Sequence, residues 1–560
     1  MKLRSLKEIQ AEYERWLKTC SEKDLVSELQ NMDAAAMEDA FYRELAFGTG
    51  GLRGIIGAGT NRMNVFTVAK ASKGLADYVN RHFEHPSIAI SYDSRLKSDV
   101  FARTAAGVFA FEGLKVYIYP NLMPTPCLSY AVRFLNCSAG IMITASHNPS
   151  EYNGYKVYGA DGCQITETAA REILADIEKL DVFEDVSAVP FDSALSDGRI
   201  SYISEDCYTS YIEEVKKQSV LFGDRIDRDL AIVYSPLNGT GLKPVTRTLQ
   251  EIGFTNITVV KEQEKPDGSF PTCPYPNPEI REAMELGLQY CEKTGADLLL
   301  ATDPDCDRCG IAVHTDKGYR LMTGNEVGLL LLDFICSQRI GHDRMPGTPV
   351  FVKTIVTMDL AEKIADHYGV RTVNVLTGFK YIGETIAVLE AEERQNDYIC
   401  GFEESYGYLT GPYVRDKDAV NAALMICEMF AWYKTRGINL QEKLDAIFKL
   451  FGYCKNTLHS YSFAGSAGMR KMAEVMQSFR NSTTEIAGRA VISLLDYSLG
   501  LDGLPKSDVL KFLMEDASVV IRPSGTEPKL KVYISVTAEN EKKADETEAE
   551  IAEFIKFRIA

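Results

Sequence analysis

The chain has 560 residues, which is too long for a single hydrophobic core and predicts about three to five domains. Lysine and arginine number 61 against 79 aspartate and glutamate, so the formal net charge is −18. This balance argues against a nucleic-acid backbone as a partner, and it means that an anionic substrate needs a locally basic site.

The N-terminal segment mixes charged and apolar residues at helical spacing and lacks the apolar core of a signal peptide. No apolar run approaches the roughly 20 residues that cross a bilayer, so we expect no membrane contact. The 13 cysteines are scattered and odd in number, which favours a reducing, cytoplasmic location. Cys306 and Cys309 have C-x-x-C spacing, but they lie in an acidic motif rather than at a helix start, which disfavours a redox site.

In chain order, residues 1–40 predict one or two helices, and a glycine-dense stretch follows at 47–62. Apolar strand-like runs then alternate with amphipathic helical runs. Residues 87–95 predict a strand that ends in a polar loop, 100–113 a helix, and 139–143 another strand. This alternation is typical of βαβ units with a mainly parallel sheet.

The same alternation recurs further along the chain, with strands expected in 229–241, 257–262, 296–308, 348–357 and 397–407. The end differs: 517–538 predict two strands around a tight loop, and 539–560 a charged amphipathic helix. We therefore expect three similar α/β domains with mixed, mainly parallel sheets, and a smaller C-terminal α+β domain. The expected boundaries are 1–200, 201–315, 316–455 and 456–560.

The segment Ile143 to Pro149, ITASHNP, follows an apolar strand. A serine at the carboxyl end of a strand lies where open α/β sheets bind ligands, although a simple polar turn is an alternative. In an extended segment, neighbouring side chains such as Ser146 and His147 diverge, so a Ser–His pair is not expected here.

The segment DPDCDR places Asp303, Asp305 and Asp307 two residues apart, on one face if the chain is extended. Three carboxylates together favour a hard cation such as Mg²⁺ or Mn²⁺. A calcium loop of the EF-hand type is excluded, because Arg308 and His314 stand where Gly and Glu are needed. A solvated acidic turn remains the alternative.

Two further motifs have the residue types for a phosphorylated sugar. In GFEESYG, the carboxylate of Glu403 and the hydroxyl of Ser405 suit sugar hydroxyls. In RPSGTEP, Arg522 offers a planar fork for phosphate, while the glycine lets backbone N–H groups approach. Each motif alone also fits an ordinary turn.

In this order and spacing, the four motifs resemble those of the α-D-phosphohexomutase superfamily, over nearly the whole chain. The TGGLRG and TGFKYIG stretches and the long N-terminal helix resemble its bacterial α-phosphoglucomutase branch. The resemblance implies four domains around a central cleft, a phosphoserine at Ser146, and Mg²⁺ held by a phosphoserine oxygen and the three aspartates.

The family's other site residues are carried over where this sequence matches its motifs. The resemblance implies catalytic roles for basic residues: Arg53, His147, Lys156, Arg308 and Lys417. It implies substrate binding by the sugar loop and the phosphate loop: Glu403, Ser405, Arg522, Ser524, Gly525 and Thr526. Some relatives have a histidine acid/base where this chain has Gly407, so Lys417 and Lys156 are the candidates for that role here.

The expected reaction is the interconversion of glucose 1-phosphate and glucose 6-phosphate, with glucose 1,6-bisphosphate as intermediate and activator. Phosphomannomutase and phosphopentomutase activities of the same superfamily are alternatives. A non-catalytic phosphosugar-binding protein would not need Ser146 and three aspartates, and an aspartyl phosphatase would leave Ser146 and the RPSGTEP loop unexplained.

Overall fold

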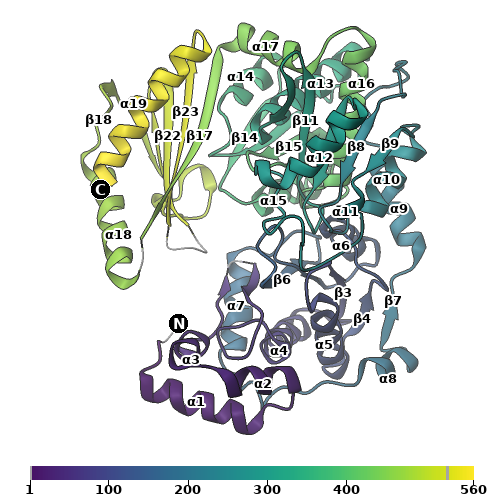
Figure 1. The fold of residues 1–560 in the computed structure, drawn as a ribbon, viewed down its shortest axis with the longest axis vertical. Helices are drawn as coiled ribbons and strands as arrows, with labels where there is room; N and C mark the ends of the chain where they lie inside the picture. The colour runs from purple at the N-terminus through teal and green to yellow at the C-terminus, as the bar shows by residue number, and fades with distance from the viewer. Residues whose placement is uncertain (1–2, 49, 464, 525–528, 560) are drawn as a thin grey trace.

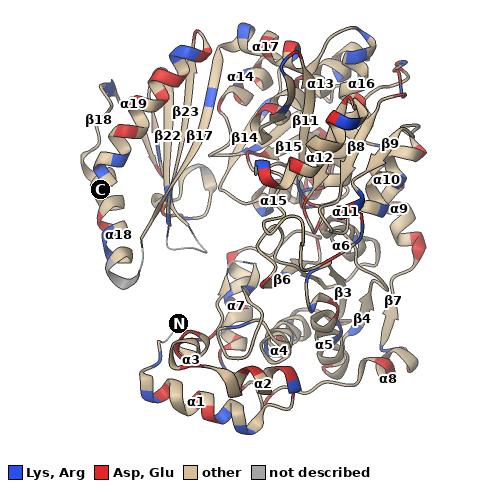
Figure 2. Cartoon of the chain, in the orientation of Figure 1, with Lys and Arg blue, Asp and Glu red and all other residues tan. Residues whose placement is uncertain are grey.

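The computed structural model describes residues 3–48, 50–463, 465–524 and 529–559, without the side chains at 465–467 and 502. Four large sheets follow one another along the chain, and the C-terminal sheet packs beside the third (Figure 1). Acidic and basic residues are interspersed along the outer helices α1 (Leu6–Thr19) and α19 (Glu541–Ile559) (Figure 2). In the part of the chain that is described, no helix is long and apolar enough to cross a membrane.

Three helices precede the first sheet, where the sequence predicted one or two. They are α1, α2 (Lys23–Asn31) and α3 (Ala34–Phe41). Each amphipathic helix buries one face, and together they enclose Trp16 and Phe41, whose rings meet edge to face at 5.8 Å. Asp33 separates the last two helices because its side chain caps α3 by accepting from the amide of Ala36.

The first sheet has seven strands in the order β1-β2-β6-β5-β3-β4-β7. Its strands are β1 (Phe47–Gly48), β2 (Gly51–Ile55), β3 (Ser87–Tyr92), β4 (Lys115–Ile118), β5 (Ala139–Ile143), β6 (Tyr152–Gly159) and β7 (Ile200–Tyr202). Its helices are α4 (Val65–His82), α5 (Ser98–Phe111), α6 (Thr125–Phe134), α7 (Glu167–Ile177) and α8 (Phe191–Ser196). β5 is buried along its whole length, so it fixes the position of the segment that follows it.

The second sheet has the order β12-β11-β10-β8-β9. Its strands are β8 (Ile232–Ser235), β9 (Ile257–Val259), β10 (Leu298–Thr302), β11 (Cys309–Thr315) and β12 (Gly318–Met322). The helices before and around it are α9 (Glu205–Lys216), α10 (Leu242–Glu251), α11 (Lys261–Glu264) and α12 (Arg281–Thr294). β10 pairs with β8 in parallel and with β11 antiparallel, so the six residues between β10 and β11 reverse the chain at the sheet end.

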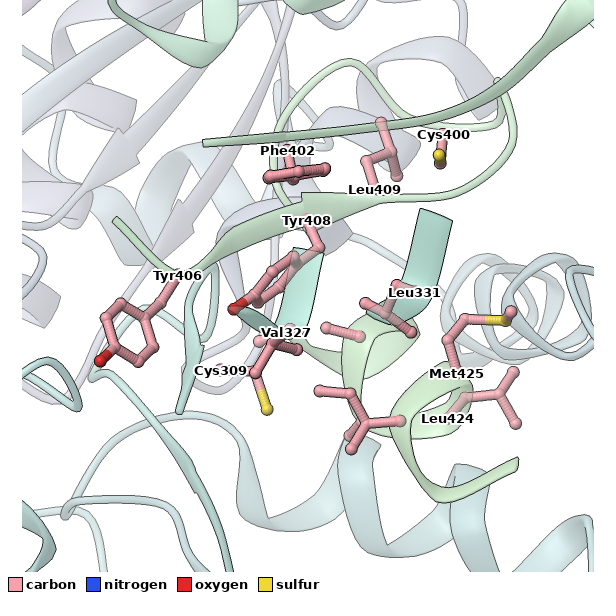
Figure 3. Packing of buried hydrophobic residues seen from close by; sticks show 14 of the residues in the cluster. Cys309, Val327, Leu331, Cys400, Phe402, Tyr406, Tyr408, Leu409, Leu424 and Met425 are labelled. Atoms are coloured by element: carbon pink, nitrogen blue, oxygen red, sulfur yellow. The ribbon is translucent and has the colours of Figure 1, made fainter. Parts of the chain in front are cut away.

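The third sheet has the order β14-β13-β15-β16. Its strands are β13 (Val350–Thr354), β14 (Arg371–Val375), β15 (Tyr398–Glu403) and β16 (Gly407–Leu409). Its helices are α13 (Gly324–Gly341), α14 (Leu360–His367), α15 (Phe379–Ala391), η1 (Gln395–Asp397), α16 (Ala419–Thr435) and α17 (Leu440–Phe451). Apolar residues of the β15–β16 hairpin pack on α13 and α16, which holds the loop between the two strands in place (Figure 3).

The C-terminal sheet is wholly antiparallel, in the order β17-β23-β22-β21-β20. Its strands are β17 (Tyr453–Ser462), β20 (Ser493–Asp496), β21 (Leu510–Leu513), β22 (Ala517–Pro523) and β23 (Lys529–Ala538). The smaller elements are α18 (Gly465–Ser482), β18 (Glu485–Ile486), β19 (Arg489–Ala490), η2 (Tyr497–Leu499) and η3 (Leu501–Gly503). The helix predicted at 539–560 is present as α19, and it covers the sheet (Figure 1).

The predicted fold class is confirmed: three α/β units with mixed sheets precede a smaller α+β unit. The C-terminal sheet is joined to the third unit at Asp359, which forms an ion pair with Lys511 at 2.7 Å and accepts from Ser518 at 2.6 Å. Burial opposes ionisation of Asp359, but Lys353 and Lys511 outweigh it and hold the pKa of Asp359 below its ordinary value.

Candidate active site

Ser146 lies directly beyond the buried strand β5, in a left-handed conformation with φ of 53°. Its amide donates to Thr144 Oγ1 at 2.8 Å, and its hydroxyl donates to Asp303 Oδ2 at 3.0 Å. His147 Nδ1 lies 3.1 Å from the same hydroxyl. The expectation that adjacent Ser and His side chains diverge is wrong here, because the positive φ makes the segment a turn. Such strained backbone is typical of functional sites.

His147 is held in its neutral form. Burial, together with the positive charges of Arg308 and Arg53, lowers the pKa of the imidazole well below its ordinary value. The ring therefore offers one donor and one acceptor nitrogen rather than a positive charge.

Arg95, which sequence reasoning did not single out, holds the loop of Ser146 from behind. Its guanidinium donates to the backbone carbonyls of Ser146, Asn148, Pro149 and Tyr152. The side chain is fully buried, and Asp93 accompanies it. Because all four acceptors belong to one turn, Arg95 fixes the direction in which the Ser146 hydroxyl points. The signal was the polar end of the strand at 87–95, which was read only as a loop.

We expect Arg95→Lys to lower kcat by about 100-fold while KM changes little, because an ammonium cannot bridge four carbonyls and a shift of about 1 Å at a nucleophile has that cost. Steady-state kinetics on folded protein measure this. Arg103→Lys, at an exposed position on α5, is the matched control. A kcat within threefold of the wild type would contradict the positioning role.

The three aspartates of DPDCDR meet at the end of β10, all buried, with one carboxylate oxygen of each within 4.8 Å of the others. They meet through a turn rather than an extended segment, because Cys306 has φ of 52°. The amides of Asp307 and Arg308 donate to Asp303 Oδ1 at 3.1 and 3.0 Å, which closes the turn. Cys306 itself is buried in the apolar core.

Two lysines from the first and third units face this acidic cluster. Lys156 Nζ of β6 lies 2.8 Å from Asp305 Oδ2, and Lys417 Nζ lies 3.1 Å from Asp307 Oδ2. Thr125, also missed in the sequence, donates to Asp305 Oδ2 at 2.9 Å from the start of α6. Burial lowers the pKa of each lysine, but the nearby carboxylates outweigh it and hold both above their ordinary values.

The aspartates retain unused ligand atoms. Burial and the charges of the other two aspartates raise the pKa of Asp303 well above its ordinary value. The Oδ1 atoms of Asp305 and Asp307 are buried, and among the described residues neither has a hydrogen-bond partner. Buried carboxylate oxygens without donors are unfavourable, and a hard cation would satisfy them.

The sugar-loop residues lie beside Arg308. The Arg308 guanidinium pairs with Glu279 at 2.6 Å and donates to the backbone carbonyl of Ser405 at 3.2 Å. Glu403 is buried at the end of β15 and accepts from the amide of Gly378 at 3.0 Å. Its burial raises its pKa. The structure thus brings the metal-site loop and the sugar loop into contact.

Gly407 leaves the space that Lys417 fills. A Cβ added at residue 407 would overlap Cδ and Cγ of Lys417. The lysine also lies 2.9 Å from Asp416, whose other carboxylate oxygen accepts from Tyr158. The side chain of Lys417 therefore occupies the space beside Gly407.

The remaining predicted residues lie further out. Arg53 of β2 donates to Asn148 at 3.2 Å, beside the Ser146 loop. Arg522, at the end of β22, donates to Tyr533 at 3.3 Å on the neighbouring strand. Ser524 donates its amide to Lys529 at 2.8 Å. Gly525 and Thr526 lie outside the described residues.

Comparison with known proteins gives the family. Four domain models of one family match the chain in order. "Phosphoglucomutase/phosphomannomutase, alpha/beta/alpha domain I" matches residues 44–183, domain II matches 209–318, domain III matches 323–451, and the C-terminal domain matches 470–554. A phosphoglucomutase of Staphylococcus saprophyticus is 37% identical over 541 residues, which cover 94% of this chain and 96% of the relative. One of Staphylococcus aureus is 36% identical over 540 residues, with the same coverage.

Solved structures share the fold. Parafusin of Paramecium, described as a phosphoglucomutase in an open form, matches with a TM-score of 0.68 at 18% identity and covers 92% of this chain and 95% of its own. A phosphoglucomutase/phosphomannomutase family protein of Burkholderia thailandensis gives the same score at 17% identity, over 91% and 97%. With relatives above one-third identity along nearly the whole length, and with a buried serine beside three aspartates, this chain belongs to the phosphoglucomutase/phosphomannomutase family.

Proposed function

We propose that the protein is a phosphoglucomutase, which moves a phosphoryl group between carbon 1 and carbon 6 of glucose by way of phosphoserine at Ser146. The observation that carries this is the 3.0 Å contact between the Ser146 hydroxyl and Asp303, in a chain about 35% identical to proteins named phosphoglucomutase. A phosphosugar-binding protein would have no use for a nucleophile beside a buried carboxylate triad.

Asp303, Asp305 and Asp307 would hold Mg²⁺, together with an oxygen of phosphoserine 146. The Oδ1 atoms of Asp305 and Asp307, which have no hydrogen-bond partner among the described residues, fit this ion, since Mg²⁺ takes only oxygen ligands in such sites. When bound, the ion would offset the negative charge of the phosphoryl group during transfer.

In the transfer itself, the protein mainly positions the reacting groups and stabilises their charge. A sugar hydroxyl oxygen attacks the phosphorus, the new O–P bond forms as the bond from Ser146 Oγ breaks, and the hydroxyl proton passes to a base. Lys156, Arg308 and Arg53 would surround the phosphoryl oxygens with positive charge. Lys417 would contact the sugar hydroxyl, because it fills the place next to Gly407. The neighbouring carboxylates raise the pKa of Lys417, so it would act as a cation and as the donor that returns a proton to the sugar oxygen when the phosphoryl group leaves it.

The first transfer produces glucose 1,6-bisphosphate, which must turn before it returns its other phosphate to Ser146. Glu403 and Ser405 would bind the ring hydroxyls in both orientations, while Arg522, Ser524, Gly525 and Thr526 would hold the phosphate that does not react. The C-terminal unit would have to move away during this turn, because a closed site would leave the sugar no room.

We expect Gly407→Ala to reduce kcat by about 100-fold, the size of a lost acid/base group, because a methyl group at 407 displaces the stem of Lys417. The backbone at Gly407 tolerates alanine, so folding should persist. Gly341→Ala, where an added Cβ meets nothing within 4 Å, is the control and should retain wild-type rates. Equal rates for the two variants would show that Lys417 takes no part in catalysis.

The substrate is tested by comparing initial rates on the 1-phosphates of glucose, mannose, glucosamine and ribose, with free phosphate measured in parallel. We expect glucose 1-phosphate to be converted fastest, with no net release of phosphate. A faster rate on ribose 1-phosphate or mannose 1-phosphate would make the protein a phosphopentomutase or a phosphomannomutase. Phosphate release without isomerisation would make it a phosphatase.

A further inference from the structure

A cavity of about 780 Å³, separate from the Ser146 site, lies where the end of α9 meets the first and third units. It is bounded by α6, by the residues after α9, by the end of α13 and by the loop after β16. Neither Ser146 nor any of the three aspartates lines it. Its volume falls within the range of small-molecule sites in proteins, which is about 300–1,000 Å³.

The cavity is positively charged in a protein whose net charge is −18. Four basic side chains line it, and two acidic ones: Arg133, Lys217, Arg339, Arg344, Glu214 and Glu390. Both carboxylates are already paired. Glu390 binds Arg133 at 2.6 Å and Arg415 at 2.7 Å, and Glu214 binds Lys217 at 2.7 Å.

Arg339 and Arg344 have no acidic partner. Within the described residues neither forms an ion pair. The Nε atom of Arg339 is buried without a hydrogen-bond partner, and its Nη1 only reaches the carbonyl of Arg344 at 3.5 Å. Burial lowers the pKa of Arg339, so its charged form is destabilised as it stands. An anion in the cavity would offset this cost, and phosphate oxygens match two guanidinium groups best.

One wall of the cavity is aromatic. The rings of Tyr130 and Phe134 on α6 stack with centroids 5.8 Å apart, and Tyr398 and Tyr413 also line the space. Such a wall favours a ligand with a flat ring over a bare ion.

The cavity shares a loop with the active site. Gly411, Pro412 and Tyr413 line it, and Asp416 and Lys417 of the same loop stand at the acidic cluster. The loop is tightly held. Gly411 has φ of 77° and packs against Gln218, so a side chain there would collide with it. A ligand that displaces Gly411 to Tyr413 would therefore also move Lys417.

We propose that this cavity is a binding site for a phosphate monoester that also contains a flat ring, such as a nucleoside monophosphate, and that its occupancy changes the activity of the mutase. The proposal is independent of which sugar the active site prefers.

Isothermal titration calorimetry tests the binding on Mg²⁺-loaded protein whose active site is filled with glucose 1,6-bisphosphate. The probes are AMP, adenosine and inorganic phosphate. We expect one AMP molecule to bind per chain, and adenosine and inorganic phosphate each to bind more weakly than AMP. Stronger binding of phosphate than of AMP would overturn the role of the aromatic wall, and no binding of any probe at millimolar concentration would overturn the site.

Two double variants locate the ligand. The double variant Arg339→Gln with Arg344→Gln should lower the affinity for AMP at least tenfold, because charge-assisted hydrogen bonds are lost. Arg171→Gln with Arg281→Gln removes the same charge from exposed positions on α7 and α12, and should change the affinity less than twofold. Equal affinities for the two double variants would place the ligand elsewhere and overturn the proposal.

Kinetics test the coupling. AMP should shift KM for the sugar phosphate at least twofold in the wild type and in the Arg171/Arg281 variant, but not in the Arg339/Arg344 variant. An unchanged KM and kcat in wild type saturated with AMP would overturn the coupling through the 411–417 loop.

Discussion

Ser146→Ala should lose the mutase reaction by several orders of magnitude. Positive charge and substrate positioning remain in this variant, but no group is left to accept and return the phosphoryl group. The methyl group fits the same turn, and only the hydrogen bonds to His147 and Asp303 are lost, so the protein should remain folded. The measurement is a coupled assay of glucose 1-phosphate conversion.

Two further measurements separate this role from a structural one. Intact-mass analysis should find a phosphate-sized adduct on part of the wild-type protein and on Ser150→Ala, but not on Ser146→Ala. Dephosphorylated wild-type protein should be slow until glucose 1,6-bisphosphate restores it. Labelled phosphate on an aspartate, or near-normal turnover by Ser146→Ala, would refute the phosphoserine mechanism.

The sequence predicted the α/β alternation and the C-terminal hairpin and helix because these are local patterns. Apolar runs such as 139–143 and 298–302 are wholly buried, and each ends at a motif. The sequence underestimated the N-terminal helices, because their division depends on a single capping residue, Asp33.

The site residues that lie in a motif resembling the family could be predicted from the sequence. The local backbone conformation and the contacts between distant residues could not. The segments at Ser146 and Cys306 were read as extended, but a positive φ turns each of them. One consequence is the contact between Ser146 and His147. Arg95 and Thr125 were missed because they act on groups about 50 and 180 residues away along the chain. The contacts of Arg95 arise from the folding of the first unit on itself, and that of Thr125 from the packing of the first unit on the second.

Removal of the metal should abolish activity, and Mg²⁺ should restore it. Two lysines face the three buried carboxylates, and a phosphoryl group on Ser146 would add about two negative charges beside them. Without a cation, that repulsion would oppose the approach of the sugar phosphate. Exhaustive chelation followed by titration with Mg²⁺ in the coupled assay measures the effect.

Asp305→Asn tests the same site through the effect of Mg²⁺ on the unfolding temperature, a readout that does not depend on turnover. Binding of Mg²⁺ to the folded wild type should raise its unfolding temperature with concentration, by about 2.7 kcal/mol of stability at 100 times the dissociation constant. Asp305→Asn should lose this response together with activity, because an amide replaces a carboxylate ligand at the centre of the triad. Asp316→Asn, in the exposed turn between β11 and β12, should keep both. Full activity after exhaustive chelation, or an unchanged thermal response in Asp305→Asn, would show that the unpaired aspartate oxygens serve another purpose.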